Sequence, residues 1–400
     1  MHWTCRILIP LLLCAPPARA DLTLSNAIAL ALAGHPALKA ARAQTAAAAG
    51  QAQQLSAWPN PELELSATDI PLDDGGLSQS KQMLSITQTL PFPGKKTLDG
   101  RIGRQQMIAT EREYRVQERE LIRNVTLAFY GVLAWQKKTT AVAELVTLTQ
   151  SLAETTRKRV AAGDTTEQEQ LRAEIEVDRA AVETAAAQRE LATARRHLAH
   201  WLGCDELSPV TGELPVTATL CARPAGHPQL AAAAAQRDRA ELEVRRAKLE
   251  ALPDLTLGVA GGRDRATDAT LMEFRVSLPL PLLDRAEGRQ RETRALAELA
   301  RHDLTATEQR LHQEWDVAAA RVSAAQTQAD VYRTRILPKA EQALKLARNG
   351  YAAGKFGFLD LLDTQRTAVE VRLAYYDKLL ELNSAAAELD ALAGEKENHQ

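Results

Sequence analysis

Apolar and polar positions along the 400-residue chain follow two periods, one typical of packed helices and one typical of strands. Between Pro93 and Pro209 there is no proline, so we expect a helix from about residue 97 to residue 161. Such a helix is roughly 100 Å long at about 1.5 Å per residue. In the second half, Pro338 is expected to kink a second long helix, because proline lacks an amide proton. Apolar side chains recur there at spacings of three and four, the pattern of a coiled-coil seam, at Trp315, Ala318, Val322, Ala325, Ala329, Tyr332 and Ile336.

Four shorter segments alternate apolar with polar residues and predict strands, near residues 62–69, 83–90, 255–259 and 271–278. We expect segments of about nine to eleven residues, enough to cross a bilayer at a tilt. The loops expected within each pair, 71–78 and 261–269, are polar and contain Gly or Asp. Four strands cannot close a barrel alone, and an open sheet edge cannot face lipid. We therefore expect the chain to oligomerise, and three chains would supply twelve strands.

The sequence contains an internal duplication. Six short motifs recur in the same order at nearly constant offsets: His35-Pro36 as His227-Pro228, Pro61-x-Leu63-x-Leu65 as Pro253-x-Leu255-x-Leu257, Leu90-Pro91-x-Pro93 as Leu278-Pro279-x-Pro281, Gly100-Arg101 as Gly288-Arg289, Ala161-Ala162-Gly163 as Ala352-Ala353-Gly354, and Gly203 as Gly394. Each repeat is expected to form a helix, two strands, a very long helix, a tight turn and a returning helix. We place the first repeat at residues 21–203, a connector at 204–226 and the second repeat at 227–396.

The first twenty residues read as an export signal. Arg6 provides a short positive region, residues 7–14 are apolar, and Ala18-Arg19-Ala20 forms an A-x-A cleavage site. The apolar stretch is shorter than the roughly 20 residues that span a bilayer. Cys14 offers a lipoprotein alternative, but Leu13 precedes it where a lipidation site requires a small residue.

Composition narrows the class of protein. Aromatic residues make up only 4% of the chain and the formal net charge is −2. A nearly balanced charge argues against nucleic acid as a partner. A sequence rich in alanine and in charges of both signs suits long helices packed closely together.

The candidate chemistry is sparse. Cys204 and Cys221 could form a disulfide in an oxidising periplasm, or they could be two separate buried thiols. The spacing of His197, His200 and Cys204 could bind zinc, but no fourth ligand is evident. Gly94-Lys95-Lys96-Thr97 lacks the earlier glycine of a phosphate-binding loop. No catalytic arrangement has local support, so we expect neither an enzyme nor a cofactor.

The whole mature chain resembles the TolC family of outer-membrane efflux proteins, through the duplication, the four alternating segments and the long helices. The motif from Gln88 to Lys96, Q-x-L-P-F-P-G-K-K, resembles the CzcC-type subgroup that works with heavy-metal pumps. The resemblance implies a homotrimer with a 12-strand barrel in outer-membrane lipid and an α-helical tunnel in the periplasm. It also implies two partners, a periplasmic adaptor and an inner-membrane pump of the RND type. The chain would then be a passive exit duct for heavy-metal cations or, alternatively, for organic compounds.

Two other protein classes compete with the duct. A structural coiled-coil protein of the periplasm would explain the heptad stripes but not the alternating segments. A helical pore-forming toxin would carry an apolar insertion hairpin, which the sequence lacks.

The most specific part of the resemblance lies in the two helical turns. In the family the second turn has a tyrosine three residues before its glycine and aspartates six and nine residues after it, matched here by Tyr351, Gly354, Asp360 and Asp363. Glu169 stands six residues after Gly163 in the first turn. The resemblance implies that Tyr351 and Glu169 help to hold the periplasmic end shut.

Asp360 and Asp363 would form acidic rings at the entrance of the duct, and carboxylates three residues apart share one helix face. Rings of acid around a pore select cations. Family members often carry an arginine two residues after the second glycine, where this chain has Phe356, so an aromatic plug would replace a salt bridge. The residues expected to contact the adaptor are Val160, Gly163, Gly354 and Phe356.

Overall fold

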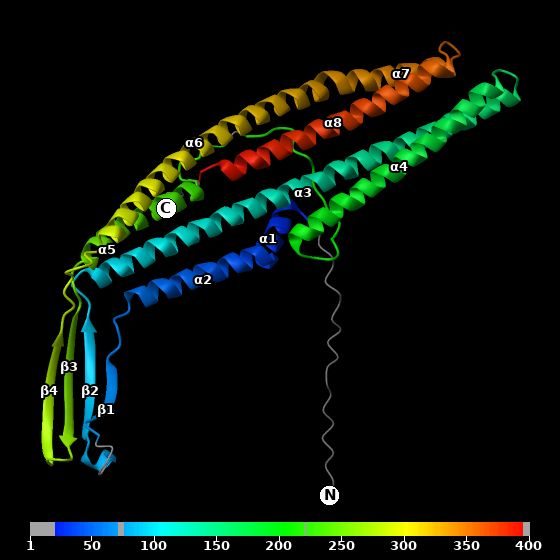
Figure 1. The fold of residues 1–400 in the computed structure, drawn as a ribbon. Helices are drawn as coiled ribbons and strands as arrows, with labels where there is room; N and C mark the ends of the chain where they lie inside the picture. The colour runs from blue at the N-terminus through cyan, green and yellow to red at the C-terminus, as the bar shows by residue number, and fades with distance from the viewer. Residues whose placement is uncertain (1–20, 71–75, 220, 222, 395–400) are drawn as a thin grey trace, which may run out of the picture. The chain divides into compact units, whose positions relative to one another are not determined.

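The computed structural model describes residues 21–70, 76–219, 221 and 223–394 (Figure 1). The expected signal peptide and Cys14 lie outside the described residues. The chain forms two compact units, each assembled from three separate stretches of sequence. One unit contains the sheet and is built from residues 36–120, 221–317 and 390–400; the other contains the helical turns and is built from residues 1–35, 121–220 and 318–389.

The sheet unit holds one antiparallel sheet with the strand order β1-β2-β3-β4. The strands are β1 (Glu62–Thr68), β2 (Lys81–Leu90), β3 (Leu255–Asp264) and β4 (Ala269–Ser277), so all four expected strands are present. β3 continues through residues 261–264, which the sequence placed in a loop. Gly262 is needed there because a Cβ at this position would lie 2.0 Å from the carbonyl oxygen of Gln82 on β2.

The sheet separates its side chains into an apolar face and a polar face. Leu63, Ile86, Val259 and Phe274 face one another across the four strands and therefore share one face. The next positions along the strands, Glu64, Ser85, Ala260 and Glu273, form a row on the opposite face. Side chains of the apolar face are exposed, among them Leu63 69%, Leu65 82%, Met272 71%, Phe274 72% and Val276 71%. Among the residues that the structure describes, no layer covers this apolar face.

Helices complete the sheet unit. They are α2 (Pro36–Ser56), the first part of α3 (Lys95–Ala161), α5 (Pro228–Glu250) and the first part of α6 (Glu287–Val331). α2 and α3 approach closely at Gly103, where a Cβ would lie 2.8 Å from the Cα of Ala52. His227 caps α5, since its Nδ1 accepts the backbone N–H of Gln229 at 3.2 Å. This histidine therefore has a structural role at the start of α5.

The second unit is entirely helical apart from its connecting segments. It contains α1 (Leu24–Gly34), the rest of α3, α4 (Glu167–Leu202), the end of α6, α7 (Leu337–Ala352) and most of α8 (Phe358–Leu392). A π-helical turn, Tyr332–Ile336, separates α6 from α7 directly before Pro338. This is the disturbance that a proline introduces when it removes a hydrogen bond from a helix. Buried alanines such as Ala134, Ala173 and Ala180 let these helices pack closely.

The two cysteines do not form a disulfide, and that alternative is wrong for this structure. Cys204 follows the end of α4, where its backbone N–H donates to Ala199 O at 3.2 Å, and the residue is exposed. The Cys221 thiol donates to Asp390 Oδ1 at 2.6 Å. The two cysteines therefore lie in different surroundings, Cys204 exposed and Cys221 in contact with Asp390. Among the described residues, no helix is both long enough and apolar enough to cross a membrane.

Candidate functional site at the helical turns

Two helix-turn-helix hairpins of the helical unit end in similar turns. The α3–α4 turn has Gly163 at φ 79° and the α7–α8 turn has Gly354 at φ 67°. Glycine adopts this left-handed conformation without steric cost, which ends a helix sharply. The amide of Asp164 donates to Arg159 O at 2.8 Å, and that of Lys355 donates to Gly350 O at 2.7 Å. The two turns are therefore built by the same backbone contacts, and both lie at one end of this unit (Figure 1).

Tyr351 joins the two hairpins. Its side chain is only 6% exposed and packs against Phe358 with ring centroids 6.2 Å apart. Its hydroxyl lies 3.5 Å from the Thr156 hydroxyl of α3, and the Arg159 guanidinium lies over its ring at 5.2 Å. Leu152, Ala173, Ala347, Leu361 and Leu362 complete the apolar cluster around it. The sequence singled out Tyr351, whereas its contacts with Thr156 and Arg159 become visible only in the structure.

The acidic residues of the turns differ in exposure, since Asp360 is exposed and Glu169 is half-buried. Glu169 and Asp360 each occupy the third position of a returning helix. Glu169 donates its backbone N–H to Thr166 Oγ1, while its carboxylate accepts the Thr165 hydroxyl. The Asp360 carboxylate accepts the backbone N–H of Gly357 at 3.1 Å. Both acids therefore stabilise helix N-termini, a role that the sequence reasoning did not assign to them.

Asp363 lies one turn further along α8 and is exposed. No side-chain hydrogen bond or ion pair involves its carboxylate within the described part of the chain. It follows Asp360 by three residues, so both carboxylates lie on the same side of the helix. An exposed pair of this kind can attract cations.

The residues expected to contact a partner are accessible at the turns. Phe356 is 49% exposed and its ring lies against Gly350, where a Cβ would be 2.2 Å from the ring. Val160 is half-buried, and Gly163 and Gly354 are exposed. The Phe356 ring is thus partly held by its own chain and partly free for another surface.

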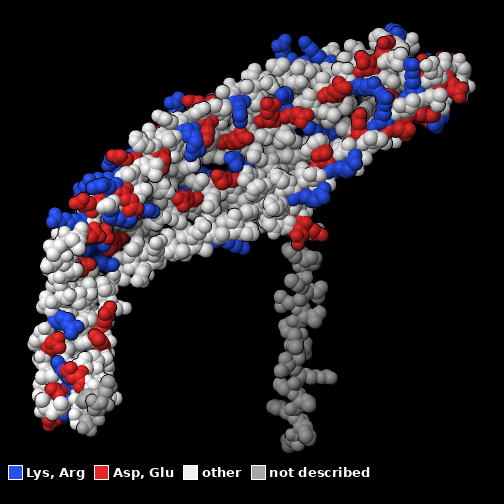
Figure 2. All heavy atoms as spheres, viewed as in Figure 1, with Lys and Arg blue, Asp and Glu red and all other residues white. Residues whose placement is uncertain are grey.

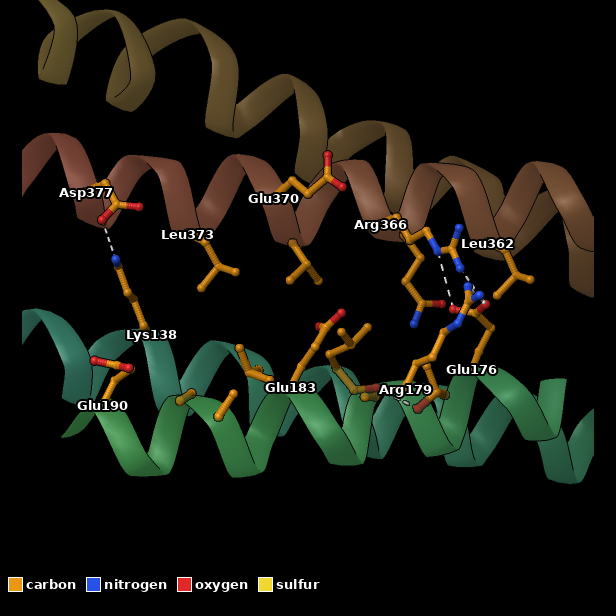
Figure 3. Close-up of a pocket in the computed structure, with 18 of the residues that line it drawn as sticks. Lys138, Glu176, Arg179, Glu183, Glu190, Leu362, Arg366, Glu370, Leu373 and Asp377 are labelled. Carbon is orange, nitrogen blue, oxygen red and sulfur yellow. Dashed lines mark hydrogen bonds and ion pairs between the residues drawn. The ribbon is translucent and has the colours of Figure 1, made fainter. Parts of the chain in front are cut away.

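A groove lies between α3, α4 and α8 of the helical unit (Figure 3). Its volume is about 660 Å³. Arg366 of α8 reaches Glu176 of α4, with Nε donating to Oε2 at 3.3 Å, and Lys138 of α3 pairs with Asp377 of α8. These ion pairs connect the two hairpins. Ion pairs with an exposed partner contribute roughly 0–1 kcal/mol each, and each pair has one shielded side chain, Lys138 at 10% and Glu176 at 15% exposed.

The sequence analysis did not predict this groove, although the sequence contains a pattern that indicates it. Glu176, Glu183 and Glu190 recur at intervals of seven residues on α4 and all line the groove. Over the surface in view, acidic and basic side chains are interspersed along the helices, with no large area of one sign (Figure 2). Across the described residues, no group of three or more His, Cys, Asp or Glu side chains is placed to hold a metal ion.

Comparison with known proteins places this chain among transport proteins. The model of the outer membrane efflux protein family matches residues 27–204 and 224–395. The chain belongs to the outer membrane efflux protein family. It is therefore a transport protein of the outer membrane and not an enzyme, as expected from the sequence.

Several known proteins are similar to this chain along almost their whole length. The cobalt-zinc-cadmium resistance protein CzcC of Cupriavidus metallidurans is 26% identical over 94% of this chain and 91% of its own. The MtrE outer membrane channel of Neisseria gonorrhoeae, solved in its open state, matches with a TM-score of 0.80 at 18% identity, over 93% of this chain and 89% of that one. The outer membrane protein VceC of Vibrio cholerae matches with a TM-score of 0.74 at 21% identity, over 93% and 96%. These matches confirm the fold class that the sequence predicted.

Proposed function

We propose that the chain is the exit duct of a tripartite efflux system for heavy-metal cations. In this proposal three copies close their sheets into one barrel of twelve strands in the outer membrane. An inner-membrane pump of the RND type supplies the cations, and a periplasmic adaptor joins the pump to the helical turns. The duct itself is passive.

The observation that carries the proposal is the two-faced sheet. Its apolar face is exposed in the single chain, with Leu65 82% and Phe274 72% accessible. Its opposite face carries Glu62, Glu64 and Arg275, together with small residues. Alternation of apolar and polar positions at this length is the pattern of a strand that faces lipid on one side and a water-filled lumen on the other. Closure over several chains also removes the unpaired edges of β1 and β4.

The substrate class rests on two supports. The similarity to a cobalt-zinc-cadmium resistance protein extends over nearly the whole chain. Asp360 and Asp363 are both exposed on α8, and under threefold symmetry they would place six carboxylates around one axis. Acidic rings raise the local concentration of cations and exclude anions. Glu169 and Tyr351 are proposed to hold this end closed in the resting duct.

The adaptor contact is proposed at the tips of the two hairpins. Val160, Gly163, Gly354 and Phe356 surround the two turns, and Phe356 offers a half-exposed aromatic ring. A partner helix could bury this ring and approach the backbone closely at the glycines. Aromatic residues are common anchors of protein interfaces.

The proposal is tested by conductance and by metal tolerance. The purified protein is placed in planar bilayers, and the ratio of cation to anion permeability is measured for the wild type and for the D360N/D363N variant. We expect the variant to lose cation preference, whereas D164N, which changes an exposed acid of the first turn, should keep it. Cells that express the chain with a cognate pump and adaptor should tolerate more cobalt, zinc or cadmium. Tolerance to organic compounds instead of metals would favour the other substrate class and contradict the metal proposal.

A further inference from the structure

The groove between α3, α4 and α8 contains a polar group that the chain itself leaves unpaired. Gln365 of α8 lines this groove and is only 2% exposed. Within the described part of the chain, its side-chain nitrogen Nε2 is buried and has no hydrogen-bond partner. A buried amide of this kind gives up its hydrogen bonds to water and gains none in return, and such groups are rare in folded proteins. The Gln365 amide therefore indicates a hydrogen-bond acceptor that the chain does not supply.

The walls of the groove are mainly aliphatic. Its volume is about 660 Å³, which falls within the range of about 300–1,000 Å³ for small-molecule pockets. Apolar side chains from all three helices line it, namely Val142, Leu145, Ala180, Ala187, Leu362 and Leu373. In Figure 3, Leu373 points from α8 into the space between the helices. A ligand that fits these walls has an apolar body, because burial of apolar surface favours its binding.

All three basic side chains that line the groove are already paired with its acids. Lys138 pairs with Asp377. Arg179 and Arg366 both pair with Glu176. The groove therefore offers no uncompensated positive charge to an anionic ligand.

The remaining acids of the groove are uncompensated. Glu183, Glu190 and Glu370 line it, and among the described residues no hydrogen bond or ion pair involves their carboxylates. Glu183 and Glu190 lie two turns apart on α4, a distance of about 10 Å along the helix, and Figure 3 shows Glu183 pointing towards α8. Carboxylates beside an apolar wall attract a cation. A metal ion fits poorly, because it requires several ligands around one point, and no such group of side chains is present in the described part of the chain.

We propose that this groove binds a small organic ammonium ion that has an apolar body and a hydrogen-bond acceptor, such as a carbonyl or sulfonyl oxygen. The ammonium group lies at Glu183, the body lies against the aliphatic walls, and the acceptor takes the N–H of Gln365. A bound ligand touches both hairpins and holds α8 against α3 and α4. This site goes beyond the exit duct and does not depend on it, because every lining residue belongs to the helical unit of one chain.

The test is the binding of dansylcadaverine to the purified mature protein in amphipol, where no free detergent micelles take up the probe. Dansylcadaverine combines a naphthalene ring, sulfonyl oxygens and a primary ammonium group. Its fluorescence increases when the ring enters an apolar site, so a titration gives the Kd. Gel filtration of the same sample determines the oligomeric state separately.

A charge variant and a matched control locate the ammonium group. E183Q should weaken binding of the probe by about tenfold or more, because a hydrogen bond to a charged group contributes at least this factor. The control is D178N, which removes an exposed acid of the same helix that does not line the groove, and its Kd should equal that of the wild type. Dansylamide, which lacks the ammonium group, should bind the wild type and E183Q equally.

Q365L tests the acceptor contact, since it replaces the amide by an apolar side chain of similar size. It should weaken binding of the probe by about two- to tenfold. The unfolding temperature without probe should not fall, because the substitution removes a buried group that had no partner. A lower unfolding temperature with an unchanged Kd would show that Gln365 has only a structural role, and the proposal would be overturned.

Two further outcomes would also overturn the proposal. Binding that E183Q and Q365L both leave unchanged would show that the probe binds elsewhere. Absence of binding to the wild type would favour a protein surface as the occupant of the groove. Neither result affects the exit duct, which is tested by the size and the conductance of the same protein.

Discussion

Replacement of Tyr351 tests how the two hairpins are held together. The side chain is 6% exposed and its ring contacts Phe358 and lies beneath the guanidinium of Arg159. Truncation of a buried large aromatic side chain to alanine costs about 3–5 kcal/mol. The hydroxyl contact with Thr156 is long, at 3.5 Å, so its loss costs at most about 0.5–1.5 kcal/mol. Tyr351→Ala should therefore loosen the turns far more than Tyr351→Phe, which keeps the ring contacts.

Hydrogen exchange measured by mass spectrometry determines how much local stability each variant loses at the turns. A local loss of about 3–5 kcal/mol raises the opening equilibrium by a factor of roughly 100 or more. We expect this acceleration in peptides from residues 344–366 of the alanine variant, while the phenylalanine variant should exchange within about tenfold of the wild type. Equal acceleration in both variants would show that the hydroxyl, not the ring, holds the hairpins, and the reasoning would be refuted.

Three further predictions concern the sheet and the helix cap. Gly262→Ala should destabilise the folded protein by about 1–3 kcal/mol or more, because the new Cβ would lie 2.0 Å from the β2 backbone. Gly261→Ala should be neutral, because a Cβ there would have nothing within 4 Å. Thermal unfolding of the two variants measures the difference. Phe274→Arg on the apolar face should reduce the fraction of protein that folds in lipid bilayers, because it lowers the free energy of unfolding by about 2–4 kcal/mol if the residue lies near the bilayer midplane. The assay is a heat-modifiable gel shift, and an unchanged folded fraction would contradict a lipid-facing side chain. Burial lowers the pKa of His227 below its usual value of 6.5, so the unfolded state binds more protons and stability should fall as the pH drops below about 6.5; the unfolding temperature of His227→Asn should fall less over the same range.

The helices and strands were predictable because their patterns are periodic and long. Alternation located all four strands, and the absence of proline after Pro93 allowed the full length of α3. The predicted end of β3 was wrong because Gly261 and Gly262 are residues typical of loops. The structure gives the reason, since Gly262 lets two backbones approach within a sheet, which is a tertiary requirement that a single sequence does not display.

Contacts between distant residues were not predictable. The pairing of Arg366 with Glu176 joins residues 190 positions apart, and nothing in either local sequence marks the other partner. The prediction of a disulfide was wrong for a similar reason, because Cys221 contacts Asp390, which is 169 positions away in the sequence. Glu169 and Asp360 were singled out as ring residues, while their position as the third residue of each returning helix gives them a second, structural role.

The most direct test of the duct is the size and location of the mature protein. Membrane fractionation followed by sizing in detergent determines both in one preparation. A trimer in the outer-membrane fraction that resists denaturing detergent until heated is the result we predict. A monomer or dimer in the soluble periplasmic fraction would contradict the barrel and would favour a structural coiled-coil protein instead.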